Sequence, residues 1–129
     1  MKKLLFYILI LMLTAGCGKT ISTELVNPPI QFTTDASAVN ISTANSFPVR
    51  VTINSTMPSR GITYSVLVTE EANGQIVNPQ MGSFSSTNAQ NRLTLTSLPQ
   101  QKWCIANITA EETGNSSNKA TTSFRVIYK

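Results

Sequence analysis

Apolar residues that alternate with polar ones at every second position constrain this chain more than any other feature. They are clearest over residues 62–69, and successive side chains of a strand point to opposite faces. No window of 11 residues shows the repeat of an amphipathic helix. One face of this segment holds Ile62, Tyr64, Val66 and Val68, and the other holds Thr63, Ser65, Leu67 and Thr69. The pattern predicts an all-β protein.

Similar short segments recur along the chain, separated by turn residues. Asn73 and Gly74 both tolerate positive φ, so they favour a type I′ turn that returns the chain as a hairpin. About seven strands with turns at this spacing predict a single antiparallel β-sandwich over residues 30–129. The expected strands are 47–53, 62–69, 75–77, 93–97, 103–110 and 121–128, preceded by one from either Ile30 and Phe32 or Val39 and Ile41.

Two apolar sets compete for the core side of segment 103–110. Cys104, Ala106, Ile108 and Ala110 form the longer set and are assigned to the core. Trp103 lies on the opposite side of the strand, and it is expected to act as a lid at the strand's start.

Segment 93–99, Leu-Thr-Leu-Thr-Ser-Leu-Pro, is followed by the aromatic Trp103. It resembles the region between the fifth and sixth strands of fibronectin type III and related immunoglobulin-like domains. There a leucine and a nearby proline end one strand, and an aromatic residue opens the next. The resemblance implies an immunoglobulin-like sandwich over about residues 46–128, and a fold by itself implies no function.

The first 16 residues have the features of an export signal. Lys2 and Lys3 precede an apolar run over residues 4–13, which is too short for a membrane span of about 20 residues. Residues 13–17, Leu-Thr-Ala-Gly-Cys, resemble the bacterial lipobox, which implies acylation of Cys17. Residues 17–29 would then form a lipidated tether that Pro28 and Pro29 close. The alternative is a secreted protein cleaved near residue 16.

A lipidated Cys17 implies a cell-envelope protein held at a membrane by more than one acyl chain. Gly18, where the enterobacterial sorting rule would look for Asp, favours the outer membrane, in either its periplasmic or its surface leaflet. Two of the cations behind the net charge of +4 belong to the signal, and the others are scattered singly. No basic stripe for nucleic acid is present.

Histidine is absent from the sequence, which excludes Ser/His/Asp triads, Cys/His dyads and histidine metal sites. Cys104 is the one thiol besides Cys17, so it is expected to be a small core residue. The carboxylate pairs at residues 70–71 and 111–112 are expected at hydrophilic loop ends, and Glu111, Glu112 and Asn115 offer too few oxygens for calcium. We expect no enzyme, no cofactor and no metal.

The remaining expectation is a non-catalytic binding or structural module. Strand reversals put residues 55–61, and a loop over 111–119 between the last two strands, beside the lipid. They put residues 70–74 and 99–102 at the far end with Lys129. The partner-binding candidates at that far end are Glu70, Asn73, Gln101 and Trp103. Two alternatives stay open: a glycan-binding module that stacks a sugar on Trp103, and an inhibitor of an envelope enzyme.

Overall fold

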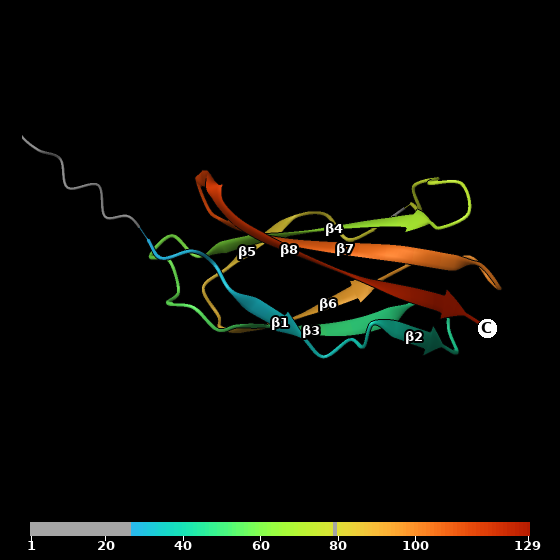
Figure 1. Ribbon diagram of the computed structural model, residues 1–129. Helices are drawn as coiled ribbons and strands as arrows, with labels where there is room; N and C mark the ends of the chain where they lie inside the picture. Colours follow the sequence, from blue (N-terminus) through green and yellow to red (C-terminus); the bar gives the residue numbers. More distant parts are fainter. Residues whose placement is uncertain (1–26, 79) are drawn as a thin grey trace, which may run out of the picture.

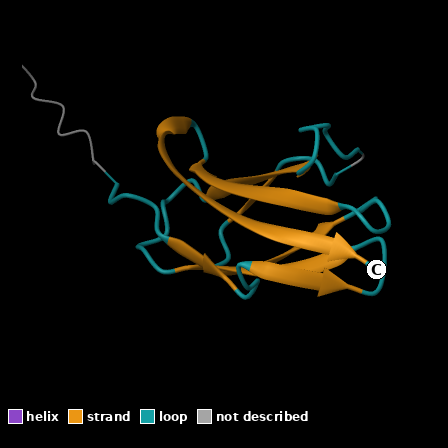
Figure 2. Cartoon of the chain, turned by 45° about the vertical axis from the view of Figure 1, so that its right-hand side comes forward, coloured by secondary structure: helices purple, strands orange, loops and turns teal. Residues whose placement is uncertain are grey.

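Alternating burial follows the polar–apolar pattern along the long strands of the computed structural model, which describes residues 27–78 and 80–129. Figure 2 shows these residues as strands joined by loops. Their eight strands are β1 (Phe32–Thr34), β2 (Val39–Ser42), β3 (Phe47–Ile53), β4 (Ile62–Glu70), β5 (Phe84–Ser86), β6 (Gln90–Leu95), β7 (Trp103–Glu112) and β8 (Asn115–Tyr128) (Figure 1). The expected signal peptide and Cys17 lie outside the described residues. Within those residues no helix is long and apolar enough to cross a membrane.

Two sheets make up the sandwich, one of three strands in the order β1-β3-β6 and one of five in the order β2-β8-β7-β4-β5. The longest ladders join β4 to β7 and β7 to β8, both antiparallel. The prediction of an all-β sandwich is confirmed. The expected strand count of about seven is corrected to eight among the described residues.

The expectation that every strand pair is antiparallel is also corrected, because β2 runs parallel to β8. Both segments proposed as alternatives for the first strand form: β1 pairs with β3, and β2 crosses to the other sheet. The Asn40 side chain stabilises the crossing, since its Nδ2 donates to the carbonyls of Ser37 (2.7 Å) and Arg125 (3.1 Å). The chain does not reverse between β1 and β2, so these two strands run in the same direction. β1 is antiparallel to β3, whereas β2 is parallel to β8.

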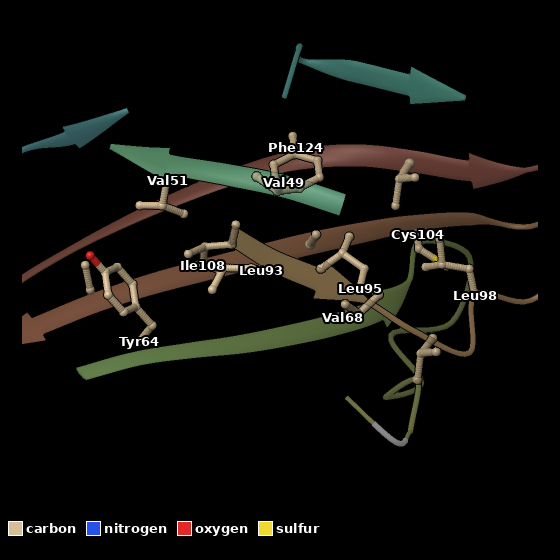
Figure 3. Packing of buried hydrophobic residues seen from close by; sticks show 14 of the residues in the cluster. Val49, Val51, Tyr64, Val68, Leu93, Leu95, Leu98, Cys104, Ile108 and Phe124 are labelled. Carbon is tan, nitrogen blue, oxygen red and sulfur yellow. The ribbon is translucent and has the colours of Figure 1, made fainter. Parts of the chain in front are cut away.

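The core lies between the sheets and follows the predicted faces (Figure 3). On β4, Ile62, Tyr64 and Val68 are fully buried, while Val66 is half-buried. The predicted inner set of β7 is buried along its whole length. Trp103 lies on the outer face of the five-stranded sheet, so it does not cover the core as a lid. The buried apolar residues of β3, β6, β4 and β7 are Val49, Val51, Ile53, Leu93, Leu95, Ile62, Tyr64, Val68, Cys104, Ala106, Ile108 and Ala110.

Strand ends depart from the expectations where turn chemistry decides them. The prediction of a loop over residues 111–119 is wrong. Gly114 has a φ of +82°, which allows a tight turn, and β8 already begins at Asn115. The strand expected over 93–97 runs instead from Gln90 to Leu95, and Ser97 already has a φ of +56°.

The turn after β4 is longer than the predicted type I′ turn. Gly74 has a φ of +70°, but Asn73 is not among the positive-φ residues. The Gly74 amide donates to the Glu70 carbonyl over 2.8 Å, and the Glu70 amide donates to the Gln75 carbonyl over 2.8 Å. Segment 75–77 then meets β4 only through an isolated bridge at Ile76, and the paired edge strand is β5.

The two ends of the sandwich are named from the chain: the proximal pole is the end at which Asn27 lies, and the distal pole is the end at which β8 finishes (Figure 1). At the proximal pole, Asn27 Nδ2 donates to Glu112 Oε1, so the chain docks against the β7–β8 turn. The amide of Ile30, the expected first residue of the domain, donates to Asn118 Oδ1 over 3.0 Å, so the Asn27 contact lies three residues before the expected start. At the distal pole, the Gln101 amide donates to the Tyr128 carbonyl over 2.7 Å, beside the C-terminal end of β8.

Candidate functional site

The four residues proposed for partner binding meet at the distal pole. Glu70 ends β4, Asn73 lies in the turn that follows, Gln101 precedes β7 and Trp103 is the first residue of β7. Together with Glu71, Ala72 and Lys102 they line an open depression of about 450 Å³. Residues separated by about 30 positions in the sequence thus share one surface, because β4 and β7 pair along their whole length.

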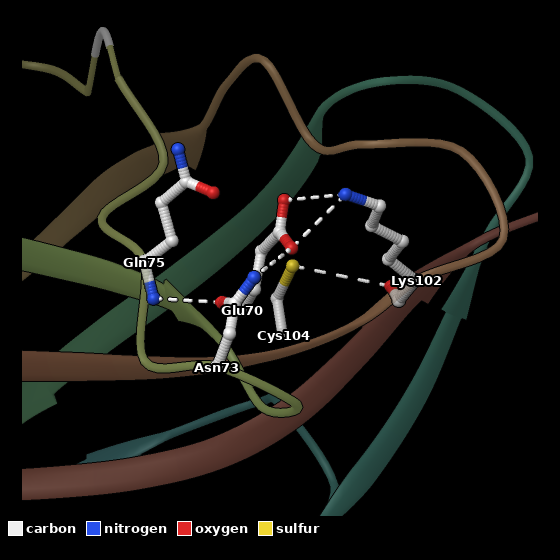
Figure 4. Close-up of polar contacts among 5 residues, drawn as sticks. All are labelled: Glu70, Asn73, Gln75, Lys102 and Cys104. Atoms are coloured by element: carbon white, nitrogen blue, oxygen red, sulfur yellow. Dashed lines mark hydrogen bonds and ion pairs between the residues drawn. The ribbon is translucent and has the colours of Figure 1, made fainter.

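Glu70 forms the inner wall of the depression. Its side chain points to the core face of β4 and is 11% exposed, and Lys102 Nζ lies 2.9 Å from Oε1 and 3.0 Å from Oε2 (Figure 4). The hydrogen bond from Lys102 is the main reason that the pKa of Glu70 lies below its ordinary value. The pair therefore closes the distal end of the core, and its carboxylate already has partners.

Asn73 holds the shape of the turn. Its Oδ1 accepts from the Gln75 amide over 2.8 Å, while its Nδ2 donates to Glu70 Oε2 over 3.2 Å (Figure 4). One amide side chain thus links the turn to the buried carboxylate, and the rim of the depression is fixed from two sides.

Trp103 carries a cation on its ring. The guanidinium carbon of Arg125 lies 4.5 Å from the ring centroid, which is within the range of a cation–π contact. The same guanidinium donates to Glu71 Oε2 through Nη2 (2.6 Å) and Nε (3.2 Å). Arg125 thus contacts both the Trp103 ring and the Glu71 carboxylate on the outer face of the sheet. A ligand on this face of the ring would have to displace Arg125.

Cys104 is buried, as the sequence predicts, with 1% of its surface exposed. Burial raises the pKa of its thiol, and the nearby carboxylate of Glu70 raises the pKa further. A thiol in this setting stays protonated and poorly nucleophilic at neutral pH.

A second buried carboxylate closes the proximal pole. Glu112 is 5% exposed, and its oxygens accept from the amides of Asn27, Asn115 (3.2 Å) and Asn118 (2.9 Å). These hydrogen bonds, that of Asn118 first, keep the pKa of Glu112 below its ordinary value. Glu112 and Glu70 are therefore buried and partnered, and the prediction that they stand at hydrophilic loop ends is wrong for both.

No group of three or more metal-ligating side chains is found in residues 27–78 and 80–129. In the combination considered for calcium, Glu111 and Glu112 are adjacent on β7 and so point to opposite faces. Asn115 turns its amide nitrogen, and not its oxygen, toward Glu112.

Two residues of the site, Lys102 and Arg125, were not singled out from the sequence. Lys102 pairs with a residue 32 positions away, and Arg125 pairs with Glu71 across 54 positions. The signal for Arg125 was present in the alternation of β8 and β7, since Arg125 and Trp103 fall on the outer face of adjacent strands. The strand order that brings them together was not available from the alternation alone.

No protein-family model and no curated protein matches the chain. Among solved structures, a solution NMR structure of a conjugate transposon protein from Bacteroides vulgatus is similar, with 15% sequence identity and a TM-score of 0.49. The match covers 78% of this chain and 86% of that one. A similarity of this size carries no argument about function.

Proposed function

We propose that this chain is a lipid-anchored protein of the bacterial cell envelope that acts as a non-catalytic binding or structural module. In this proposal, acylated Cys17 holds the chain at the outer membrane, and a tether leads from the lipid to one immunoglobulin-like domain. The lipobox-like residues 13–17 and the preceding apolar run support the anchor.

The strand order supports the immunoglobulin-like assignment. In that family's lettering, β1, β3 and β6 correspond to strands A, B and E, and β2, β8, β7, β4 and β5 correspond to A′, G, F, C and C′. The crossing of the first strand from one sheet to the other gives both A and A′.

The distal depression is the observation that carries the binding proposal. It lies at the pole opposite Asn27, where the tether enters, so it would point away from the membrane. A larger depression of about 590 Å³ at the proximal pole is lined by Asn27 itself, and there the tether and the bilayer would compete with any partner.

A protein partner fits the distal depression better than a glycan does. Flat sugar rings bind proteins by stacking on an exposed aromatic face, and Arg125 covers a face of Trp103. The lining of the depression instead combines the apolar Ala72 and Trp103 with polar side chains such as Gln101, a composition typical of protein interfaces. An inhibitor of an envelope enzyme would use the same surface.

The anchor is tested by Cys17→Ser in the full chain. We expect loss of acylation, and an unprocessed or soluble product, because only the Cys17 thiol can carry the thioether. Metabolic labelling with an alkyne fatty acid and membrane fractionation measure both effects. A processed Cys17→Ser chain that remains in the membrane fraction would contradict the proposal.

The partner site is tested by two single-cysteine variants, Asn73→Cys and Asn115→Cys, in a Cys104→Ala background. Each carries a thiol-directed photocrosslinker and is illuminated in intact envelopes. We expect a defined protein adduct from position 73 and none from position 115, and Gln101→Ala should reduce the adduct. Capture from position 115 alone would overturn the proposed site.

A further inference from the structure

The outer face of the five-stranded sheet carries an unusual concentration of exposed apolar side chains. Within residues 27–78 and 80–129, the large hydrophobic residues with high exposure are Val39 (50%), Ile41 (58%), Leu67 (46%) and Ile76 (53%). All four come from β2, from β4 or from the segment bridged to β4. Such residues are normally scattered singly over a soluble domain, so their gathering on one face indicates an interface.

The pairing register shows how these residues are arranged. Paired residues on neighbouring strands share a face, so Val39, Arg125 and Ile105 form one row across β2, β8 and β7. The next row toward the distal pole holds Ile41, Ile127 and Trp103. Ile127 is only 8% exposed although it lies outside the core cluster, so the outer face has a small apolar layer of its own.

An ion pair crosses the middle of this apolar face. Arg125 and Glu71 have side chains that are 43% and 36% exposed, and they separate an apolar flank on β2 from one on β4 and the bridged segment. The face thus presents one cation and one anion side by side between two apolar flanks. Such a surface is complementary to a copy of itself turned by a half rotation.

The face approaches the size that a standard interface needs. Its strands β2, β8, β7, β4 and β5 have 4, 14, 10, 9 and 3 residues, and at about 3.3 Å per residue and about 4.8 Å between strands they give an area of about 630 Å². A standard interface buries about 800 Å² on each partner, with an apolar centre and a polar rim. The proximal part of the face supplies that rim through Thr109 and Thr121, which are hydrogen-bonded to each other at 3.1 Å.

The outer face of the three-stranded sheet does not have these properties. Arg50 and Arg92 lie directly opposite each other there, and Thr52 pairs with Gln90. Two copies that met through this face would bring four arginines together, which like-charge repulsion disfavours.

We propose that a second copy of this chain binds the outer face of the five-stranded sheet as a two-fold symmetric dimer. The two-fold axis runs parallel to the strands, between Arg125 and Glu71, so each Arg125 faces the Glu71 of the other copy. Val39 and Ile41 on β2 then face Leu67 and Ile76 of the other copy. An axis in this direction keeps both Asn27 ends at the same pole, so both copies can be tethered to one bilayer. The dimer face shares Glu71 and Trp103 with the rim of the distal depression, so the dimer is tested separately from the partner of that depression.

The test uses two differently tagged copies of the full chain, co-expressed and extracted from the envelope in mild detergent. One tag is captured, and the amount of the other tag is measured. Wild-type copies are expected to co-purify. Arg125→Glu on both copies, or Glu71→Arg on both copies, should reduce co-purification at least about tenfold, because each places like charges opposite each other.

The decisive combination is Arg125→Glu on one copy with Glu71→Arg on the other. Each chain has then lost its internal ion pair, but both contacts across the dimer again join opposite charges, so co-purification should return. Ile41→Lys should reduce co-purification, whereas Gln90→Lys and Arg92→Glu on the other sheet should leave it unchanged. Thermal melting of each variant separates loss of the dimer from loss of the fold.

Two results would overturn the proposal. Wild-type copies that fail to co-purify exclude the dimer, including the case in which each copy binds a different protein through this face. Copies that co-purify equally well with like charges at positions 71 and 125 exclude this face and this axis.

Discussion

Replacing Val68 with Asp tests the arrangement of the sandwich at its centre. Val68 is fully buried on the inner face of β4 and belongs to the apolar core, and the one charged side chain beside it on that face, Glu70, is already paired with Lys102. An unpaired carboxylate at such a position costs several kcal/mol, and loss of the buried valine side chain adds about 1.5 kcal/mol or more. The sum, about 5 kcal/mol, is comparable to the whole stability of a small domain.

Three variants on the same strand give a graded series. Val68→Asp should lower the Tm by about 20 °C or prevent folding, since about 1 kcal/mol corresponds to 4–8 °C in a domain of this size. Val66→Asp should have an intermediate effect because Val66 is half-buried, and the exposed Ser65→Asp on the outer face should be mild. Circular dichroism melts of the three variants provide the measurement. Equal Tm values for Val68→Asp and Ser65→Asp would refute the assignment of faces.

Three further predictions concern the carboxylates, the turns and the thiol. Glu70 and Glu112 have folded-state pKa values below the ordinary 4.5, so they stabilise the fold above that pH and cease to do so as the pH falls through the lowered values. The Glu70→Gln/Glu112→Gln variant should therefore be less stable than wild type in urea at about pH 7, and the difference should shrink as the pH is lowered below 4.5. Gly61 and Gly74 both have positive φ. A Cβ at Gly61 would lie 2.7 Å from a β5 backbone oxygen, whereas a Cβ at Gly74 would have no atom within 4 Å. Gly61→Ala should therefore lower the Tm clearly more than Gly74→Ala. Cys104 should react with Ellman's reagent only after denaturant unfolds the domain, and fast labelling of the native protein would show that the distal end of the core opens.

Period-two alternation was sufficient to predict the inner faces of β4 and β7, because burial on one side of a strand leaves a direct mark on composition. It could not predict that β2 runs parallel to β8, since strand direction across a sheet depends on how the chain crosses between layers. The same limit applies to the site. Glu70 and Trp103 were recognisable as residues of the distal pole, but their partners Lys102 and Arg125 depend on pairing between distant segments.

The burial of two carboxylates was the other feature that the local sequence did not predict. Two adjacent glutamates suggest a solvated loop, yet at each pole one member of the pair turns inward. The hydrogen-bond donors that stabilise the two carboxylates are an amine and one asparagine amide at one pole and three asparagine amides at the other. They lie near the carboxylates only once the sheets have formed.

The parallel pairing of β2 with β8 has a mechanical consequence. A pull between the N-terminal side of β2 and the C-terminal end of β8 draws these neighbours in opposite directions along their common axis. The four residue pairs from Val39–Arg125 to Ser42–Tyr128 then bear the load together in shear, and they are not unzipped one at a time. A domain held at its N-terminus and pulled at its distal pole is loaded along the direction in which its strand pairing resists most.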